Sequence, residues 1–232
     1  MRFLDCARLV LLALVCLTCL SAASCAATEA SLEDTTARWA ISAHRHVVFR
    51  SFRRPGSDPA PIAADCARCH SSTGYLDFLG ADGSTPGKVD QATHVAGTIQ
   101  CQVCHNRVSR SKDTAVMPSG MVLDGLGRNA DCFECHQGRT SRLQVEEAVA
   151  GVGADVAQAG LKLPTLHNRA AGPTSFGMRA QSGYEYPGLS YVARYRHVNE
   201  LDTCITCHDP HSLDVDPIRC IACHLEVRTR AD

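Results

Sequence analysis

Cysteine and histidine are the residues of this chain whose types and spacing could do chemistry. The motif Cys-x-x-Cys-His occurs five times, as Cys66-Ala67-Arg68-Cys69-His70, Cys101-Gln102-Val103-Cys104-His105, Cys132-Phe133-Glu134-Cys135-His136, Cys204-Ile205-Thr206-Cys207-His208 and Cys220-Ile221-Ala222-Cys223-His224. Two thiols at this spacing can add across the two vinyl groups of one porphyrin, and the histidine that follows can ligate its iron from the proximal side. The pattern therefore predicts five covalently attached c-type haems. Structural zinc also uses Cys-x-x-Cys, but it needs pairs of such pairs and gives no reason for the recurrent histidine.

The cysteines outside the motifs lie close to the N-terminus. The chain has 14 cysteines, ten of them in the motifs, and the others are Cys6, Cys16, Cys19 and Cys25. Residues 26–232 therefore keep no thiol for a disulfide bond, a nucleophile or another metal. We expect no disulfide bonds, although an exported protein would meet an oxidising compartment.

Six histidines outside the motifs are candidates for the second axial position of the irons. The chain has 11 histidines, and those not in a motif are His44, His46, His94, His167, His197 and His211. Six for five irons is close to a full set, so we predict that they serve mainly as distal ligands. Met117, Met121 and Met178 would be needed only where a histidine is not used.

Local sequence ranks these distal candidates. His94 and His197 are each followed by valine, and each lies seven residues before a motif. His46 also precedes a valine and is preferred to His44 for that reason. His167 is the one histidine between Gln137 and Arg196.

His211 lies three residues after His208, the proximal candidate of the fourth motif. Pro210 between them has a fixed backbone φ, so this short link cannot reach around a porphyrin to the opposite face of the same iron. A helical turn would place positions three apart on one side. We therefore expect His211 to ligate a haem other than the one on Cys204 and Cys207.

Residues 1–25 have the features of a secretory signal peptide. The positively charged residues Arg2 and Arg8 precede a short apolar stretch over residues 9–17, and small residues follow that stretch. The segment Ala22-Ala23-Ser24-Cys25 resembles a bacterial lipobox, which would make a lipidated Cys25 the first residue of the mature protein; the alternative is ordinary cleavage beside it. We expect an exported protein, either periplasmic or an outer-membrane or cell-surface lipoprotein, which meets a membrane only through that lipid.

Composition predicts a mainly α-helical domain over residues 26–232 with little regular secondary structure. Aromatic residues make up only 5% of the chain, and 17 glycines and 10 prolines supply frequent turns. We expect a loop-rich chain that wraps a packed array of five haems, whose faces supply much of the buried surface. In the interval between the third and fourth motifs, residues 142–162 favour a helix that ends before Pro164, and residues 168–195 favour an ordered loop.

Charge argues against a nucleic-acid partner. The formal net charge is −1 and the chain has no basic run, while two propionates on each haem would make the loaded protein acidic. Arginines greatly outnumber the three lysines Lys88, Lys112 and Lys162. Because arginine makes forked contacts with carboxylates, propionate pairing is one reading of this excess, and codon preference is the other.

The chain resembles the small bacterial multihaem c-type cytochromes. The resemblance covers residues 44–224, and the segment Cys207-His208-Asp209-Pro210-His211-Ser212 is similar to a Cys-His-x-Pro-His segment of pentahaem and decahaem electron carriers. It implies a pentahaem cytochrome domain with low-potential haems, each iron held between two histidines. It also implies transfer of electrons to and from other redox proteins, or to an extracellular metal acceptor.

Two other functions stay open. A multihaem reductase of a small oxyanion would need one iron with an open position; related nitrite reductases mark that haem with lysine in place of the motif histidine, and no such variant occurs here. A subunit of a haem-stacked cytochrome filament, or another homo-oligomer, is the second alternative. We expect an electron carrier rather than a catalyst, so no catalytic residue is assigned.

Overall fold

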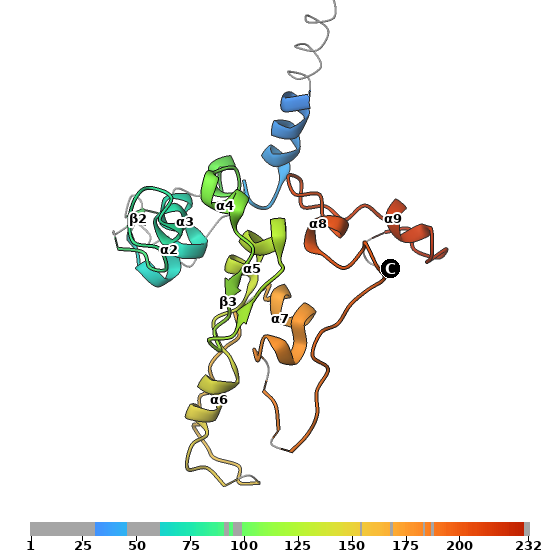
Figure 1. Ribbon diagram of the computed structural model, residues 1–232. Helices are drawn as coiled ribbons and strands as arrows, with labels where there is room; N and C mark the ends of the chain where they lie inside the picture. Colours follow the sequence, from blue (N-terminus) through green and yellow to red (C-terminus); the bar gives the residue numbers. More distant parts are fainter. Residues whose placement is uncertain are drawn as a thin grey trace, which may run out of the picture.

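The computed structural model describes residues 31–45, 61–90, 93–94, 99–153, 155–167, 169–182, 184–186 and 188–229. The described chain is largely helical, with short elements joined by turns and loops, which confirms the prediction of a mainly α, loop-rich fold (Figure 1). A helix over residues 31–41 begins the described part. The α-helices that follow are α2 (Ala64–His70), α3 (Ser72–Leu79), α4 (Arg107–Ser111), α5 (Ala130–His136), α6 (Arg142–Ala148), α7 (Ala171–Phe176), α8 (Cys204–Cys207) and α9 (Ile218–Ile221), with 3-10 turns η2 (Cys101–Val103), η3 (Gly127–Asn129) and η4 (Gly177–Arg179).

The strands in the described ranges form two small antiparallel pairs. Strands β1 (Pro61–Ile62) and β2 (Thr93–His94) pair Pro61 with His94, and β3 (Ala115–Val116) and β4 (Val122–Leu123) form a hairpin. The hairpin turns at Gly120, whose φ of 81° lies in the left-handed region that favours glycine. Each strand is two residues long, so these pairs connect neighbouring loops and do not form a β-sheet layer of the fold.

All five Cys-x-x-Cys-His motifs lie on a helical turn. The first and third motifs fill the ends of α2 and α5, which share the sequence Ala-Asp-Cys-x-x-Cys-His. The other three lie on η2, α8 and α9 with the residues that follow them. Residues three apart in a helical turn lie on the same side of it, so both thiols of a motif can reach one bound group.

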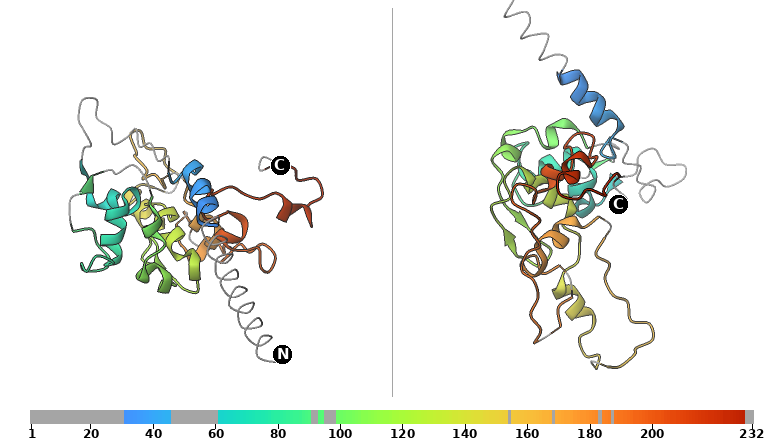
Figure 2. Two further views of the ribbon diagram at one scale, coloured as in Figure 1. Left: turned by 90° about the horizontal axis from the view of Figure 1, so that it is seen from above. Right: turned by 90° about the vertical axis from the view of Figure 1, so that its right-hand side faces the viewer.

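Helix α5 lies at the centre of the described chain and belongs to both of its apolar clusters (Figures 1 and 2). One cluster contains Ala130 and Phe133 of α5 with residues of β3, β4 and α7. The other contains Tyr75, Leu79 and Val103, and Cys135 of α5 packs against it. The third motif is therefore the most enclosed of the five.

The region between the third and fourth motifs differs from the prediction for residues 142–162. Helix α6 ends at Ala148, and Gly151 then adopts a φ of 83°. The N-terminus of α6 is stabilised, because Ser141 and Gln144 form a reciprocal capping box. Two glycines, Gly151 and Gly153, follow within five residues of its end and disfavour its continuation, because glycine carries a large entropic cost in a helix.

Residues 168–195, predicted to form a loop, contain α7 and η4. The ring of Phe176 meets the ring of Phe133 edge to face, with centroids 5.1 Å apart. Gly172 lies so close to α5 that an added Cβ would be 2.8 Å from Cδ1 of Phe133. Tertiary packing against α5 thus orders a segment that is rich in turn residues.

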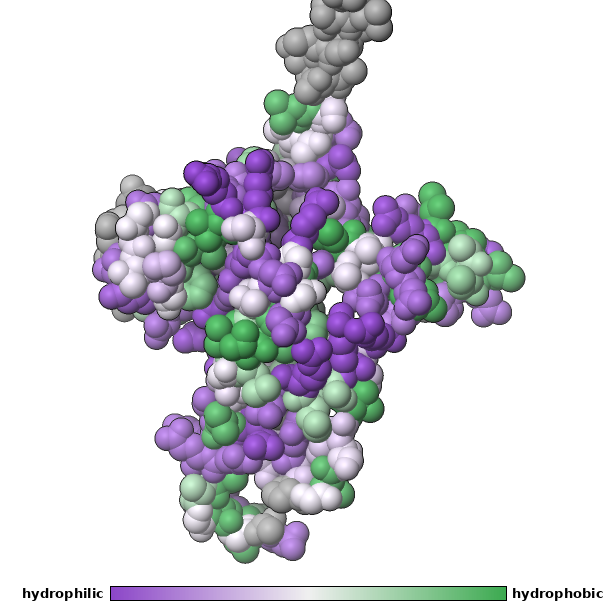
Figure 3. Space-filling model, viewed as in Figure 1, coloured by the Kyte–Doolittle hydropathy of each residue, from purple (hydrophilic) through white to green (hydrophobic). Residues whose placement is uncertain are grey.

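Apolar side chains remain on the surface in separate places. Ile218 and Leu225 beside the fifth motif are 75% and 72% exposed, and green areas at the right of Figure 3 mark this part of the chain. Within the described ranges, no helix is both long enough and apolar enough to span a membrane.

We predict that Gly172→Ala lowers the free energy of unfolding by about 1–3 kcal/mol, because the new methyl group overpacks the contact with Phe133. Chemical denaturation followed by circular dichroism measures the loss. The double variant Gly172→Ala/Phe133→Leu is the control, because the smaller side chain makes room for the methyl group. A double variant less stable than the sum of the two single changes would contradict this packing.

Candidate haem sites

The ten motif cysteines are free thiols on the helical turns described above. Each turn ends at the motif histidine, one residue after the second thiol, so thiols and imidazole project from one short segment. This is the arrangement that covalent attachment of one porphyrin requires: two sulfurs toward its edge and an imidazole toward its centre.

Four motif histidines each face a histidine from elsewhere in the chain. The ring centroids are 6.5 Å apart for His44 and His136, 5.9 Å for His70 and His167, 6.2 Å for His105 and His211, and 6.0 Å for His197 and His224. Each pair joins one proximal candidate to one distal candidate named from the sequence. The pairing itself could not be read from the sequence, because the partners lie far apart along the chain.

The separation within each pair fits one axially ligated iron. A bond from imidazole nitrogen to a metal is about 2 Å long, so two imidazoles on opposite sides of one metal have centroids about 6 Å apart. Two imidazoles are also a chemically suitable axial set for haem iron. Within the described ranges, no three Cys, His, Asp or Glu side chains converge as they would around a structural metal ion.

Two motif histidines are oriented by backbone carbonyl groups. Nδ1 of His136 lies 2.9 Å from the carbonyl oxygen of Arg169, and Nδ1 of His208 lies 3.0 Å from that of Leu213. As an N–H donor at Nδ1, each ring keeps Nε2 unprotonated, and such a bond typically orients histidine ligands of metals. Nε2 of each ring then keeps a lone pair that can ligate a metal.

Burial favours the neutral form of one imidazole in each of two pairs, His44 and His70. Burial lowers the pKa of His44 to about 4, and the neighbouring His136 and Arg169 act in the same direction. Burial also lowers the pKa of His70, helped by His167. Neutral imidazole is the form that ligates a metal, so no proton has to leave these rings near neutral pH.

The loop that carries His167 is held against the chain just after the third motif. The hydroxyl of Thr140 donates a hydrogen bond of 2.7 Å to the carbonyl of Thr165, and the backbone N–H of Arg139 donates one of 3.0 Å to that of Leu166. His167 then adopts a left-handed φ of 73°. This turn directs its ring toward His70 of the first motif, while Arg169 meets His136 of the third.

A side-chain cap shapes the turn between His208 and His211. The carboxylate of Asp209 accepts hydrogen bonds from the backbone N–H groups of His211 and Ser212 at 2.9 and 2.8 Å, and it pairs with Arg38 at 2.5 Å. Burial acts to raise the pKa of Asp209, but these N–H groups and the guanidinium outweigh it and hold the pKa below its ordinary value. The turn separates the rings of His208 and His211, and the ring of His211 faces His105 of the second motif.

The fourth motif differs from the others. Among the residues that the structure describes, no second histidine ring faces His208. Of the sequence candidates, His46 lies outside the described residues, as does the side chain of His94, whose backbone forms part of β2. The sequence favoured His46 over His44, whereas the structure describes His44 and brings it to His136.

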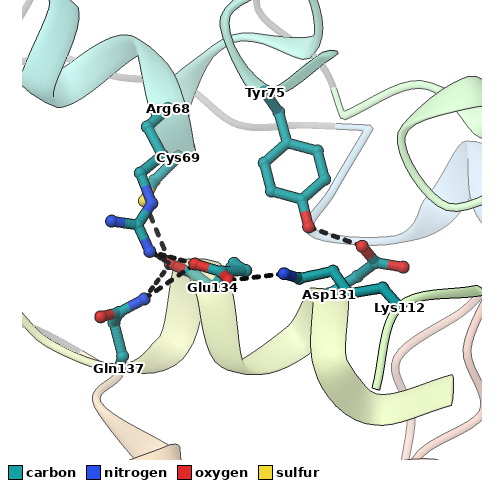
Figure 4. Close-up of polar contacts among 7 residues, drawn as sticks. All are labelled: Arg68, Cys69, Tyr75, Lys112, Asp131, Glu134 and Gln137. Carbon is teal, nitrogen blue, oxygen red and sulfur yellow. Dashed lines mark hydrogen bonds and ion pairs between the residues drawn. The ribbon is translucent and has the colours of Figure 1, made fainter. Parts of the chain in front are cut away.

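A buried polar cluster between the first and third motifs was not foreseen from the sequence (Figure 4). Glu134 is 2% exposed, and its carboxylate pairs with Arg68 and with Lys112, the latter at 2.9 Å. Gln137 donates a hydrogen bond of 2.9 Å to the Glu134 carbonyl, and nearby Tyr75 donates one of 2.6 Å to Asp131. One sequence signal could have revealed this cluster. The residue before the second cysteine is positively charged in the first motif (Arg68) and negatively charged in the third (Glu134).

Comparisons with known proteins do not assign a family. The chain matches no protein-family model, no curated protein and no solved structure. Its own residues and their geometry therefore carry the functional argument.

We predict that the cap at Asp209 stabilises the fourth-motif turn more than its ion pair does. Asp209→Ala removes both and should cost about 1–2 kcal/mol of unfolding free energy. Asp209→Asn keeps an acceptor for the two N–H groups and loses only a partly exposed ion pair, so its cost should stay below about 1 kcal/mol. Denaturation curves measure both, and equal losses would show that the charge, not the cap, is what matters.

Proposed function

We propose that this protein is an exported electron carrier with five covalently attached c-type haems. The observation that carries the proposal is the combination of five Cys-x-x-Cys-His turns with four opposed imidazole pairs, 5.9–6.5 Å between centroids. Bound haem would supply reversible one-electron chemistry at its iron. The chain supplies the thiols for attachment, the imidazoles on both faces, and the spacing.

Ligation of each iron by two histidines favours electron transfer over catalysis. An opposed histidine pair would hold haem iron from both faces and would leave no site for a substrate. Four pairs of this kind support a protein that accepts and passes electrons through transient contacts with other redox proteins, or to an extracellular metal acceptor. Export, with or without a lipid at Cys25, belongs to the same proposal, whereas a haem-stacked filament or another homo-oligomer is an alternative to it.

The alternative of an oxyanion reductase has one specific place in the structure. Only His208 lacks a facing histidine ring among the described residues, so an iron with an open position would be the one at the fourth motif. An electron paramagnetic resonance spectrum of the oxidised protein separates the two functions. A purely low-spin ferric spectrum is expected for the carrier, whereas a high-spin signal with cyanide binding and nitrite turnover would favour the reductase.

We predict that the mass of the purified protein exceeds that of its processed polypeptide by five haem groups. Changing Cys132 and Cys135 to Ser should remove one haem and destabilise the protein, because this motif lies in the core. The matched variant with Cys220 and Cys223 changed to Ser should also lose one haem but with a smaller loss of stability, since α9 lies at the edge of the fold (Figure 1). A holoprotein with any other number of haems would refute the proposal.

We predict that His211→Ala opens the iron held by the second motif. The ring of His211 faces His105, with planes only 7° apart. The variant should therefore show one high-spin ferric haem, and haem-resolved nuclear magnetic resonance should locate it on Cys101 and Cys104. Asp209→Asn, which keeps the turn, is the control and should leave all haems unchanged; a high-spin iron on Cys204 and Cys207 would overturn the pairing.

A further inference from the structure

Helix α5, which carries the third motif, is the meeting point of other haem-attachment turns. Helix α2 of the first motif contacts it on one side. On the other, α8 of the fourth motif contacts the turn η3, which runs directly into α5. The order of motifs along the chain is therefore not their order in space.

The second thiol of the first motif lies against the second thiol of the third. Sγ of Cys69 is 3.6 Å from the carbonyl oxygen of Glu134, the residue before Cys135. The thiols of Cys69 and Cys135 are also in hydrogen-bond contact with each other. These two sulfurs are neighbours.

The first thiol of the third motif lies against the first thiol of the fourth. Cys204 packs on the apolar cluster that contains Ala130 and Phe133, and the N–H of Ile205 donates a hydrogen bond of 3.2 Å to Oδ1 of Asn129. The thiols of Cys132 and Cys204 are in hydrogen-bond contact as well. The third motif thus has a neighbouring sulfur at each of its own thiols.

A contact between the sulfurs of two motifs implies a contact between the haems that those motifs would hold. Attachment forms a bond from sulfur to one vinyl carbon and moves the thiol hydrogen to the other, so each sulfur ends up next to the porphyrin edge. Two sulfurs in contact therefore bring two porphyrin edges together, and the protein fixes which cofactors can exchange electrons by fixing this spacing.

An ion pair stabilises the contact between the first and third motifs. Arg68 and Glu134 are the residues immediately before Cys69 and Cys135, and their side chains form an ion pair (Figure 4). The Arg68 guanidinium also lies 4.1 Å from the centroid of the Phe78 ring. Among the described residues, removal of Arg68 would leave Glu134 only Lys112 as a charged partner, so the Arg68–Glu134 ion pair is suited to hold α2 against α5.

We propose that the haem on Cys132 and Cys135 is the junction of the array: its Cys135 edge meets the first haem at Cys69, its Cys132 edge meets the fourth haem at Cys204, and the Arg68–Glu134 ion pair positions the first contact. Electrons that travel between the first and fourth haems then pass through the third. This inference rests on the proposed haem attachment and adds the route through the array.

Nuclear Overhauser spectra of the fully reduced holoprotein test the junction. Cross-peaks are expected between the thioether protons of Cys69 and Cys135 and between those of Cys132 and Cys204. If all five haems are present and the third haem shows thioether cross-peaks to neither the first nor the fourth, the junction is wrong while the proposed function stands. A holoprotein with fewer haems would instead count against the proposed function.

Arg68→Gln tests the positioning role of the ion pair. The Cys69–Cys135 cross-peak should be lost or strongly weakened and the Cys132–Cys204 cross-peak kept, while Arg68→Lys should retain both. Glu185→Gln is the matched control, because it breaks a comparable ion pair with Arg142 away from these turns. An intact first contact in Arg68→Gln, or equal loss of both contacts, would overturn the positioning role, and Arg68→Lys decides the question if Arg68→Gln fails to fold.

Discussion

The buried carboxylate of Glu134 is the constraint on which the centre of this protein depends. A charge removed from water is tolerated only when opposite charges and hydrogen-bond donors surround it. Arg68 comes from the first motif and Lys112 from the end of α4, while Gln137, the residue after the third motif, donates a hydrogen bond to the same carboxylate. Satisfying one carboxylate therefore brings two separate segments to the third motif.

The same helix organises the apolar contacts. Phe133 faces β3, β4 and α7, whereas Cys135 faces the cluster around Tyr75 and Val103. Both clusters are small, as expected for a chain with few aromatic residues, and each is built from one- or two-turn elements. Short helices of this kind are marginal in isolation, so their contacts with α5 decide where they lie.

The opposed imidazoles link segments that are remote in sequence. His44 meets His136, and His211 meets His105, across long stretches of chain that contain other motifs. An iron bound between such residues would act as a cross-link, constraining the unfolded chain much as a metal site does. In the proposed holoprotein, therefore, cofactor attachment and tertiary structure support each other.

The sequence by itself determined the helical, loop-rich character of the chain and the identity of the candidate ligands, because motif spacing and turn composition are local properties. It overestimated the length of the helix after Ser141, which Gly151 and Gly153 follow, and it missed α7, which packs against Phe133. The tertiary structure alone decided which histidines oppose one another and which thiols are neighbours. Such pairings depend on long-range packing and on a buried charge at Glu134, and neither leaves a periodic signal in the sequence.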